Sequence, residues 1–140
     1  MAMRLLHFGF AVRDVEATTT AWRELFGIDW EPVARHALPD PDQGADHVSL
    51  VTHGRTGDGV EIEMVQTVSG RTVDAQVFGD REGVSHVAFQ VDDLATERAR
   101  MIAAGVEVVD EGSAPRADWV FLRDPRLGGA LVQLVQLRRP

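Results

Sequence analysis

The sequence contains no cysteine, no lysine and no tyrosine. The absence of cysteine excludes disulfides, a thiol nucleophile and a metal site built from thiolates. All 14 basic residues are arginine, which excludes catalysis through a lysine Schiff base. Any proton transfer by a side chain must therefore use histidine, aspartate or glutamate.

Charge and hydrophobic pattern restrict the partners and the location. The formal net charge is −8 and the pI is about 5.0, so neither nucleic acid nor an anionic membrane is expected as a partner. No apolar run approaches the roughly 20 residues that span a bilayer, and the N-terminus lacks a signal-peptide pattern. We expect a cytoplasmic protein with a single domain over residues 1–140, and the composition is typical of a GC-rich bacterial genome.

Two stretches of the chain each occur twice. Residues 7–14 are echoed by residues 86–93, and residues 60–66 are echoed by residues 130–136. Similar offsets over most of the chain indicate two copies of one module. Four polar residues occupy matching positions in the two copies: His7, Glu63, His86 and Gln133.

Each copy predicts a strand, a helix and three further strands. In the first copy we expect strands at 4–12, 28–35, 47–52 and 60–66, with a helix at 15–26. In the second we expect strands at 84–91, 106–109, 118–122 and 130–137, with a helix at 94–104. Module one then covers about 4–67 and module two about 83–137. The linker, about 68–82, is expected to hold a short helix at 73–78.

Local signals refine these expectations. Asp14 and Asp93 are the expected N-caps of the two long helices. The segment 36–46, rich in Asp and Pro, is expected to be a loop. The first helix is expected to pack through one apolar stripe, made of Val15, Trp22, Leu25 and Phe26.

Strand alternation places the four matched residues on faces that the helices do not cover. In the first strand, Phe8 and its apolar neighbours face one way and His7 the other, and His86 lies opposite an apolar face in the same manner. In the closing strands, Glu63 and Gln133 each lie between two apolar residues of the opposite face. If the sheets curve, all four residues line the concave side.

With these features the chain resembles the vicinal oxygen chelate superfamily, which includes glyoxalase I, methylmalonyl-CoA epimerase, extradiol dioxygenases and antibiotic resistance proteins. The resemblance rests on the paired modules, on His-x-x-x-x-Val before each capped helix, and on Ile-Glu-Met and Val-Gln-Leu in the closing strands. It implies an α+β fold in which two βαβββ modules form an incompletely closed eight-stranded barrel around one divalent metal ion, often in a homodimer. The implied metal ligands are His7, Glu63, His86 and Gln133.

Within the superfamily the pattern is most similar to methylmalonyl-CoA epimerase, on segments 42–44, 83–86 and 128–134. That enzyme has Gln at the position of Glu63 and Glu at the position of Gln133, so the carboxylate has changed modules here. Its catalytic Glu corresponds to His47, and its second acid/base group corresponds to Gln133, which cannot carry a proton. The resemblance therefore implies a relative that acts on another substrate.

The implied ligand set defines a chemistry. Two imidazoles, one carboxylate and one amide oxygen suit a borderline divalent ion such as Mn, Fe, Co, Ni or Zn. A small-molecule substrate with two adjacent oxygens would chelate the ion, which stabilises an enolate-type intermediate as a neighbouring C–H loses its proton. His47 is the expected base, because imidazole ordinarily titrates at about 6.5, and Glu63 is the second candidate. We therefore expect a metal-dependent isomerase, epimerase or lyase.

Two other functions stay open. A metal-free protein that sequesters an antibiotic or natural product would have the same fold and no use for the matched His and Glu residues. An Fe(II) dioxygenase would use the two-His-one-carboxylate set of His7, His86 and Glu63, but Gln133 would then occupy a position that oxygen needs, and tyrosine is absent. His36 and His53 are expected to be solvated loop residues, and Arg116, Arg123 and Arg126 to belong to a solvated hairpin.

Overall fold

The computed structural model describes residues 3–40 and 42–139, which form two compact units. The N-terminal unit consists of residues 8–85. The C-terminal unit consists of residues 86–139 together with the described residues before Phe8. Strands β1 (Arg4–Ala11) and β5 (Gly83–Gln90) each contribute residues to both units.

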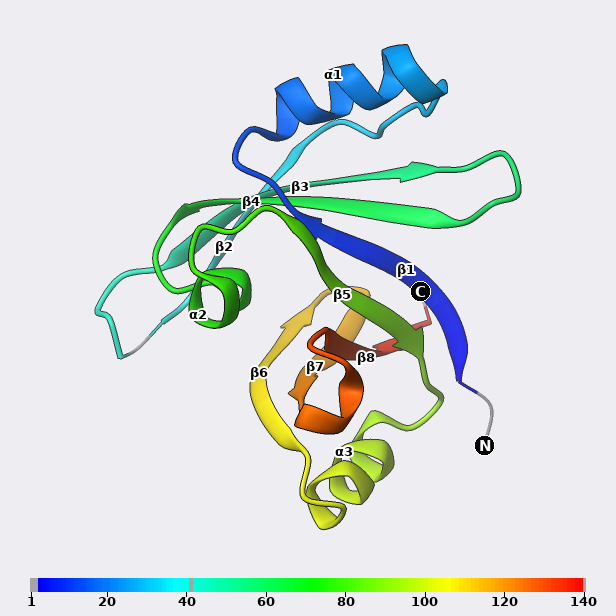
Figure 1. The fold of residues 1–140 in the computed structure, drawn as a ribbon. Coiled ribbons are helices and arrows are strands. Elements are labelled where there is room, and N and C mark those ends of the chain that lie inside the picture. Colours follow the sequence, from blue (N-terminus) through cyan, green and yellow to red (C-terminus); the bar gives the residue numbers. More distant parts are fainter. Residues whose placement is uncertain (1–2, 41, 140) are drawn as a thin grey trace. The chain divides into compact units, whose positions relative to one another are not determined.

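The N-terminal unit is a sheet with the strand order β2-β3-β4-β1, on which one helix packs (Figure 1). Its further elements are α1 (Val15–Phe26), β2 (Ala34–Leu38), β3 (His47–Arg55), β4 (Glu61–Ser69) and α2 (Val73–Phe78). Helix α1 contacts β3 and β4. The core beneath it includes Val15 and Met64, both fully buried, with Trp22 and Trp30 partly buried beside them.

The C-terminal unit repeats this plan with the strand order β5-β8-β7-β6. Its elements after β5 are α3 (Leu94–Ala103), β6 (Glu107–Ala114), β7 (Ala117–Arg123), a 3₁₀ turn (Pro125–Leu127) and β8 (Leu131–Leu137). Helix α3 covers one face of β6, β7 and β8, where Val120, Leu122 and Leu134 are buried. The predicted α+β class with two βαβββ modules is confirmed.

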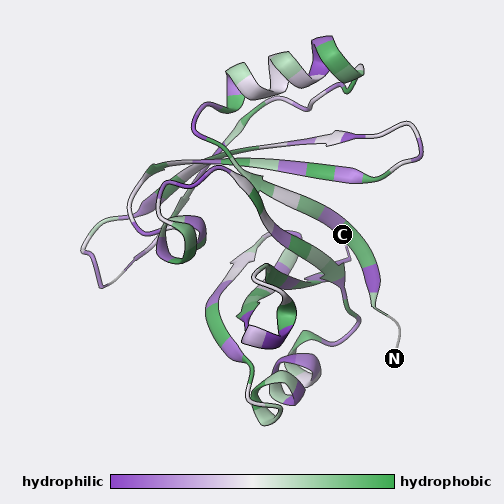
Figure 2. Ribbon diagram, in the orientation of Figure 1, coloured by the Kyte–Doolittle hydropathy of each residue, from purple (hydrophilic) through white to green (hydrophobic). Residues whose placement is uncertain are grey.

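The strands carry both hydrophobic and hydrophilic residues, as the mixed colours along them in Figure 2 show. For the second strand the predicted bounds were wrong. Residues 28–33 form no strand apart from a single bridge between Trp30 and Gly54, and β2 lies at 34–38, so it shares only residues 34–35 with the expected strand and continues into the expected loop. Four of the five residues of β2 are exposed, so the sequence of this strand has no hydrophobic pattern. The position of β2 is set by its pairing with β3.

The apolar stripe expected on α1 is only partly buried. Val15 is fully buried, but Leu25 and Phe26 keep 73% and 65% of their surface exposed. Thr19, one turn after Val15, takes the inward position instead and donates its hydroxyl proton to the carbonyl of Val15. The last turn of the helix thus extends past the core that the first turns cover.

Both long helices begin with the same two contacts. Asp14 accepts a hydrogen bond from the amide of Ala17 at 3.0 Å, and Asp93 accepts one from Thr96 at 3.1 Å, as predicted for N-caps. In addition, a glutamine of each closing strand accepts a bond from the first helical amide. Gln66 binds the amide of Val15 at 2.9 Å and Gln136 that of Leu94 at 2.8 Å.

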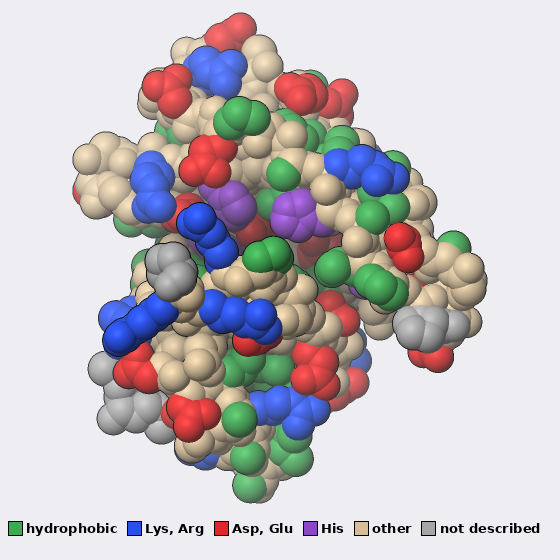
Figure 3. All heavy atoms as spheres, turned by 180° about the vertical axis from the view of Figure 1, so that it is seen from behind, with side chains coloured by type: hydrophobic (Ala, Val, Ile, Leu, Met, Phe, Trp, Pro, Cys, Tyr) green, Lys and Arg blue, Asp and Glu red, His purple; other side chains and the backbone are tan. Residues whose placement is uncertain are grey.

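The charged surface consists largely of paired residues. Arg98 binds Glu111 through two nitrogens, at 3.0 and 2.9 Å, and Arg123 lies 3.1 Å from Glu107. On the face shown in Figure 3, acidic and basic side chains are interspersed. Among the described residues, no helix has both the length and the apolar character that crossing a membrane requires.

The repeated glutamine contact makes a stability prediction. Gln66→Leu and Gln136→Leu should each lower the free energy of unfolding by about 1–3 kcal/mol, because each leaves a helix-initiating amide without its acceptor. Urea denaturation measures the loss. Gln43→Leu, at an exposed loop residue, is the control and should change stability by less than about 0.5 kcal/mol. Losses no larger than that of the control would show that the contacts do not hold the helices.

Candidate metal centre

Two histidines that the duplication relates lie against each other in the C-terminal unit. His7 on β1 is 5% exposed and His86 on β5 is 2% exposed. Their Nε2 atoms are 3.0 Å apart, and the rings meet nearly edge to face, with centroids 5.2 Å apart and an interplanar angle of 76°. As a direct hydrogen bond, this contact requires one ring to carry the Nε2 proton and the other to accept it.

The same spacing fits a shared cation. Two nitrogens bound at about 2.1 Å, at right angles on one ion, are separated by about 3.0 Å. The Nε2 atoms of His7 and His86 have this separation. The pair is therefore arranged as two neighbouring ligands of one divalent ion would be.

The sheet of the C-terminal unit brings Gln133 to the same side as His86. In the parallel β5–β8 ladder, His86 pairs with Leu131 and Ala88 with Gln133, so the two polar residues share a face. Phe121 on β7 pairs with Gln133 and packs edge-on against the ring of His86, with centroids 5.3 Å apart. This face is the one opposite to the core that α3 covers.

Gln133 carries an unused acceptor. The residue is 8% exposed, and its Oε1 accepts no hydrogen bond from the part of the chain that the structure describes. A buried amide oxygen without a donor is costly, and such atoms are rare unless a ligand satisfies them. A cation would satisfy Oε1, and together with the two imidazoles this donor set fits the predicted metal.

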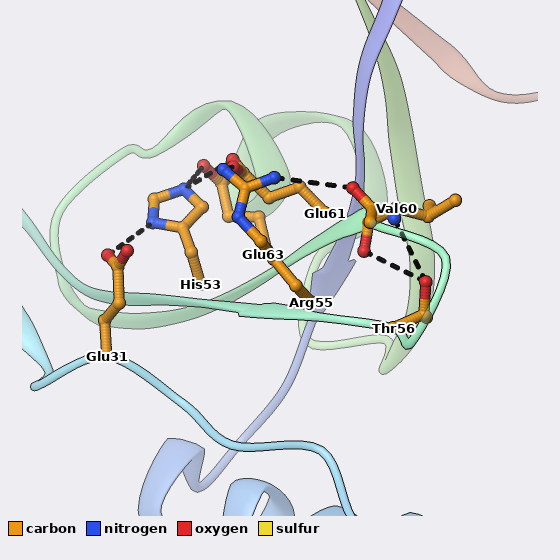
Figure 4. A network of polar contacts seen from close by, with 8 residues as sticks. Glu31, His53, Arg55, Thr56, Val60, Glu61 and Glu63 are labelled. Carbon is orange, nitrogen blue, oxygen red and sulfur yellow. Dashed lines mark hydrogen bonds and ion pairs between the residues drawn. The ribbon is translucent and has the colours of Figure 1, made fainter.

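The carboxylate of the predicted set lies in the N-terminal unit and has a histidine partner. Glu63 on β4 stands directly opposite His53 on β3, and His53 Nε2 lies 2.8 Å from Glu63 Oε2 (Figure 4). The side chains of His53 and Glu63 are 31% and 16% exposed. Glu61 and Glu31 approach the same imidazole at 3.8 and 4.0 Å.

This surrounding changes the pKa of His53. Burial by itself lowers the pKa, because the charged ring loses hydration. The hydrogen bond to Glu63 and the charges of Glu63, Glu61 and Glu31 act in the opposite direction. Together they outweigh burial, so the pKa of His53 lies above its ordinary value.

His47, the predicted base, begins β3 and is held by the segment after β4. Its Nδ1 donates to the carbonyl of Arg71 at 3.1 Å, which leaves Nε2 with the lone pair in the neutral ring. Gly70 lies so close that a Cβ there would come within 2.7 Å of the His47 Cα, so only glycine fits. The hydrogen bond from Nδ1 to the carbonyl of Arg71 fixes the tautomer that a general base needs.

The structure does not bring His47 next to Glu63. Glu63 pairs with His53, six residues farther along β3, and this corresponds to about 20 Å of strand between the Cα atoms of the two histidines. The expectation that His53 is a loop residue was wrong, because β3 continues to Arg55. Alternation from His47 to His53 puts both on one strand face, and this pattern is the sequence signal that identifies His53 as a strand residue.

The remaining histidine, two of the hairpin arginines and one tryptophan have the following surroundings. His36 is exposed on β2, not in a loop. Arg123 and Arg126 are paired with Glu107 and Asp124 around the last hairpin. Trp119 packs over Gly112, where a Cβ would come within 2.3 Å of the indole.

Comparison with known proteins identifies the family. Residues 6–122 match the Glyoxalase/Bleomycin resistance protein/Dioxygenase superfamily. The chain belongs to this superfamily. The resemblance noted in the sequence is thereby confirmed, and the fold of its members is the fold found here.

The relatives include epimerases of similar length. The ethylmalonyl-CoA/methylmalonyl-CoA epimerase of Cereibacter sphaeroides is 27% identical over 98% of this chain and 100% of its own. The methylmalonyl-CoA epimerase of Mycobacterium tuberculosis has a similar structure, with a TM-score of 0.68 and 23% identity over 97% of this chain and 89% of its own. A hypothetical protein from Bacillus halodurans reaches a TM-score of 0.72 with 18% identity, over 100% and 98% of the two chains. The two structural likenesses show the shared superfamily fold.

The unused acceptor of Gln133 makes a prediction for the ion-free protein. Gln133→Leu, measured in the presence of a chelator, should leave the free energy of unfolding unchanged or raise it, because no hydrogen bond is lost. Gln136→Leu is the matched variant on the same strand, three residues away, and should lower stability by about 1–3 kcal/mol. Urea denaturation of both variants checks this. Equal losses for the two variants would show that Gln133 is already satisfied within the chain.

Proposed function

We propose that this protein is a divalent-metal-dependent isomerase, epimerase or lyase that removes a proton from a carbon beside two oxygens of a small substrate. The observation that carries the proposal is the pair of buried imidazole nitrogens of His7 and His86, 3.0 Å apart. Two further observations support it: the oxygen of Gln133 accepts no hydrogen bond from the described residues, and the chain is similar to an epimerase over that enzyme's full length.

The proposed ligands are one side chain from each matched position: His7, Glu63, His86 and Gln133. The neutral imidazoles and the amide contribute no charge, and Glu63 contributes one negative charge. A site of net charge near +1 prefers an anionic oxygen ligand over water. When bound, an ion such as Mn, Fe, Co, Ni or Zn would polarise the substrate oxygens and stabilise the negative charge that develops on them.

The proposed proton acceptor is His47. The bond from its Nδ1 to the carbonyl of Arg71 leaves Nε2 free to accept a proton. His47 lies six residues along β3 from the residue opposite Glu63, which counts against its direct access to a carbon chelated at Glu63. Glu63 is the alternative acceptor.

The substrate class follows from the same residues. Two bases on opposite sides of a carbon are needed for direct epimerisation, and Gln133 cannot carry a proton. We therefore propose that the substrate differs from that of the methylmalonyl-CoA epimerases, although it shares with an acyl thioester the acidic C–H beside oxygen. His47 as a single base would give hydrogen exchange, isomerisation or elimination.

The metal is the first point to test. Wild-type protein purified without chelators should contain about one divalent ion per chain, and His86→Ala should lose it. Elemental analysis by mass spectrometry measures the content, and His36→Ala, at an exposed histidine, should retain the wild-type content. Absence of metal from the wild type would reject the proposal in favour of the metal-free sequestering protein.

The base is tested by hydrogen exchange. His47→Gln should keep the metal but abolish exchange of the substrate's α-hydrogen in deuterated water, because an amide cannot accept the proton. Proton NMR of small acyl thioesters follows the exchange. Undiminished exchange in His47→Gln, with wild-type exchange present, would remove His47 from the mechanism and transfer the role to Glu63.

A further inference from the structure

Gln133 has only apolar neighbours on its face of the C-terminal sheet. Its partner in the β5–β8 ladder is Ala88, and its partner in the β7–β8 ladder is Phe121. Leu131 and Val135, two residues before and after it on β8, point to the same face because side chains alternate along a strand. These four residues, which we call the apolar frame, are all buried. None of their side chains can donate a hydrogen bond.

The apolar frame accounts for the unused acceptor of Gln133. The Oε1 atom is buried and accepts no hydrogen bond from the described residues. A buried water needs two to four polar partners, and no side chain of the frame can serve as one. The ring of Phe121 also packs edge-on against the imidazole of His86, so the frame borders directly on a proposed metal ligand.

The first copy of the module is polar at the matching positions. His53 and Glu61 stand where the second copy has Phe121 and Leu131. His53 lies 2.8 Å from the carboxylate of Glu63, whereas no such donor faces the amide of the second copy. A buried charge needs compensating partners, which an apolar frame lacks. The carboxylate therefore occurs in the polar copy and the neutral amide in the apolar one.

We propose that the apolar frame sets the affinity of the metal site by keeping the oxygen of Gln133 available for the ion. The inference rests on the proposed metal-binding function. An acceptor that already has a hydrogen bond must give it up before it binds an ion, and this cost lowers the affinity. In the apolar frame no bond has to be broken. The frame residues touch neither the ion nor the substrate and act through Gln133.

The experiment adds a hydroxyl donor to the frame and measures Co(II) binding to the whole protein by isothermal titration calorimetry. Ala88→Ser places the hydroxyl directly across the ladder from Gln133. Val135→Thr adds one with almost no change in side-chain shape. Each variant should bind Co(II) roughly three- to tenfold more weakly than the wild type, because the new hydrogen bond to Gln133 must break first.

Val120→Thr is the matched control, because it adds the same hydroxyl on the opposite face of the sheet. Val120 is buried in the core beneath α3 and pairs with Leu134. This variant should bind Co(II) within about twofold of the wild type. A loss of affinity as large as that of Val135→Thr would show that general loosening of the unit lowers the affinity, and would overturn the proposal.

Carbon-13 NMR follows the new hydrogen bond directly. In protein kept free of ions by a chelator, the side-chain carbonyl carbon of Gln133 should resonate farther downfield in Ala88→Ser and Val135→Thr than in the wild type, because its oxygen has gained a donor. The resonance should not move in Val120→Thr. Absence of the shift from both frame variants would show that the oxygen is already satisfied, which overturns the proposal.

The remaining outcomes separate this inference from the proposed function. A downfield shift with wild-type Co(II) affinity would overturn the role of the frame and leave the metal-dependent function intact. Tighter Co(II) binding would show that the new hydroxyl binds the ion itself, which also overturns the proposal. Circular dichroism confirms folding, and Val135→Thr decides alone should Ala88→Ser unfold. A wild type that binds no divalent ion would overturn the proposed function and this inference with it.

Discussion

The close approach of two buried imidazoles is the constraint on which the proposed chemistry depends. Nitrogen atoms 3.0 Å apart must share either a proton or a cation, since two lone pairs or two N–H groups at this distance repel. His86 is further fixed by the edge of Phe121, and the oxygen of Gln133 on the same face has no donor among the described residues. A cation would satisfy both the two imidazole nitrogens and the oxygen of Gln133, whereas a shared proton would satisfy only the imidazoles.

Duplication of one module explains why the histidines occur as a matched pair. Divergence of the two copies explains why only one of them carries a carboxylate. Both copies keep the aspartate cap and the glutamine that binds the first helical amide, so the scaffold has stayed nearly symmetrical. The polar position in the closing strand differs between the copies, because Glu63 stands where the other copy has Gln133. The carboxylate half has also acquired a histidine partner across its hairpin, whereas Gln133 faces Phe121 in its antiparallel ladder.

Much of the fold and part of the site could be predicted from the sequence, because internal repetition and strand alternation report on burial directly. These signals located both long helices, the caps and the four matched residues. They failed where burial is weak or where pairing decides: β2 is almost entirely exposed, and the end of α1 leaves Leu25 and Phe26 in solvent. His53 was missed for a related reason, since the register that puts it opposite Glu63 is a property of the folded hairpin.

The central claim is that one divalent ion binds both duplicated histidines. The most direct measurement is an anomalous difference map from crystals grown with Co(II) or Mn(II). The account predicts one strong peak within about 2.1–2.2 Å of the Nε2 atoms of His7 and His86. A peak elsewhere, or continuous density for a direct contact between the two rings without an ion, would contradict it.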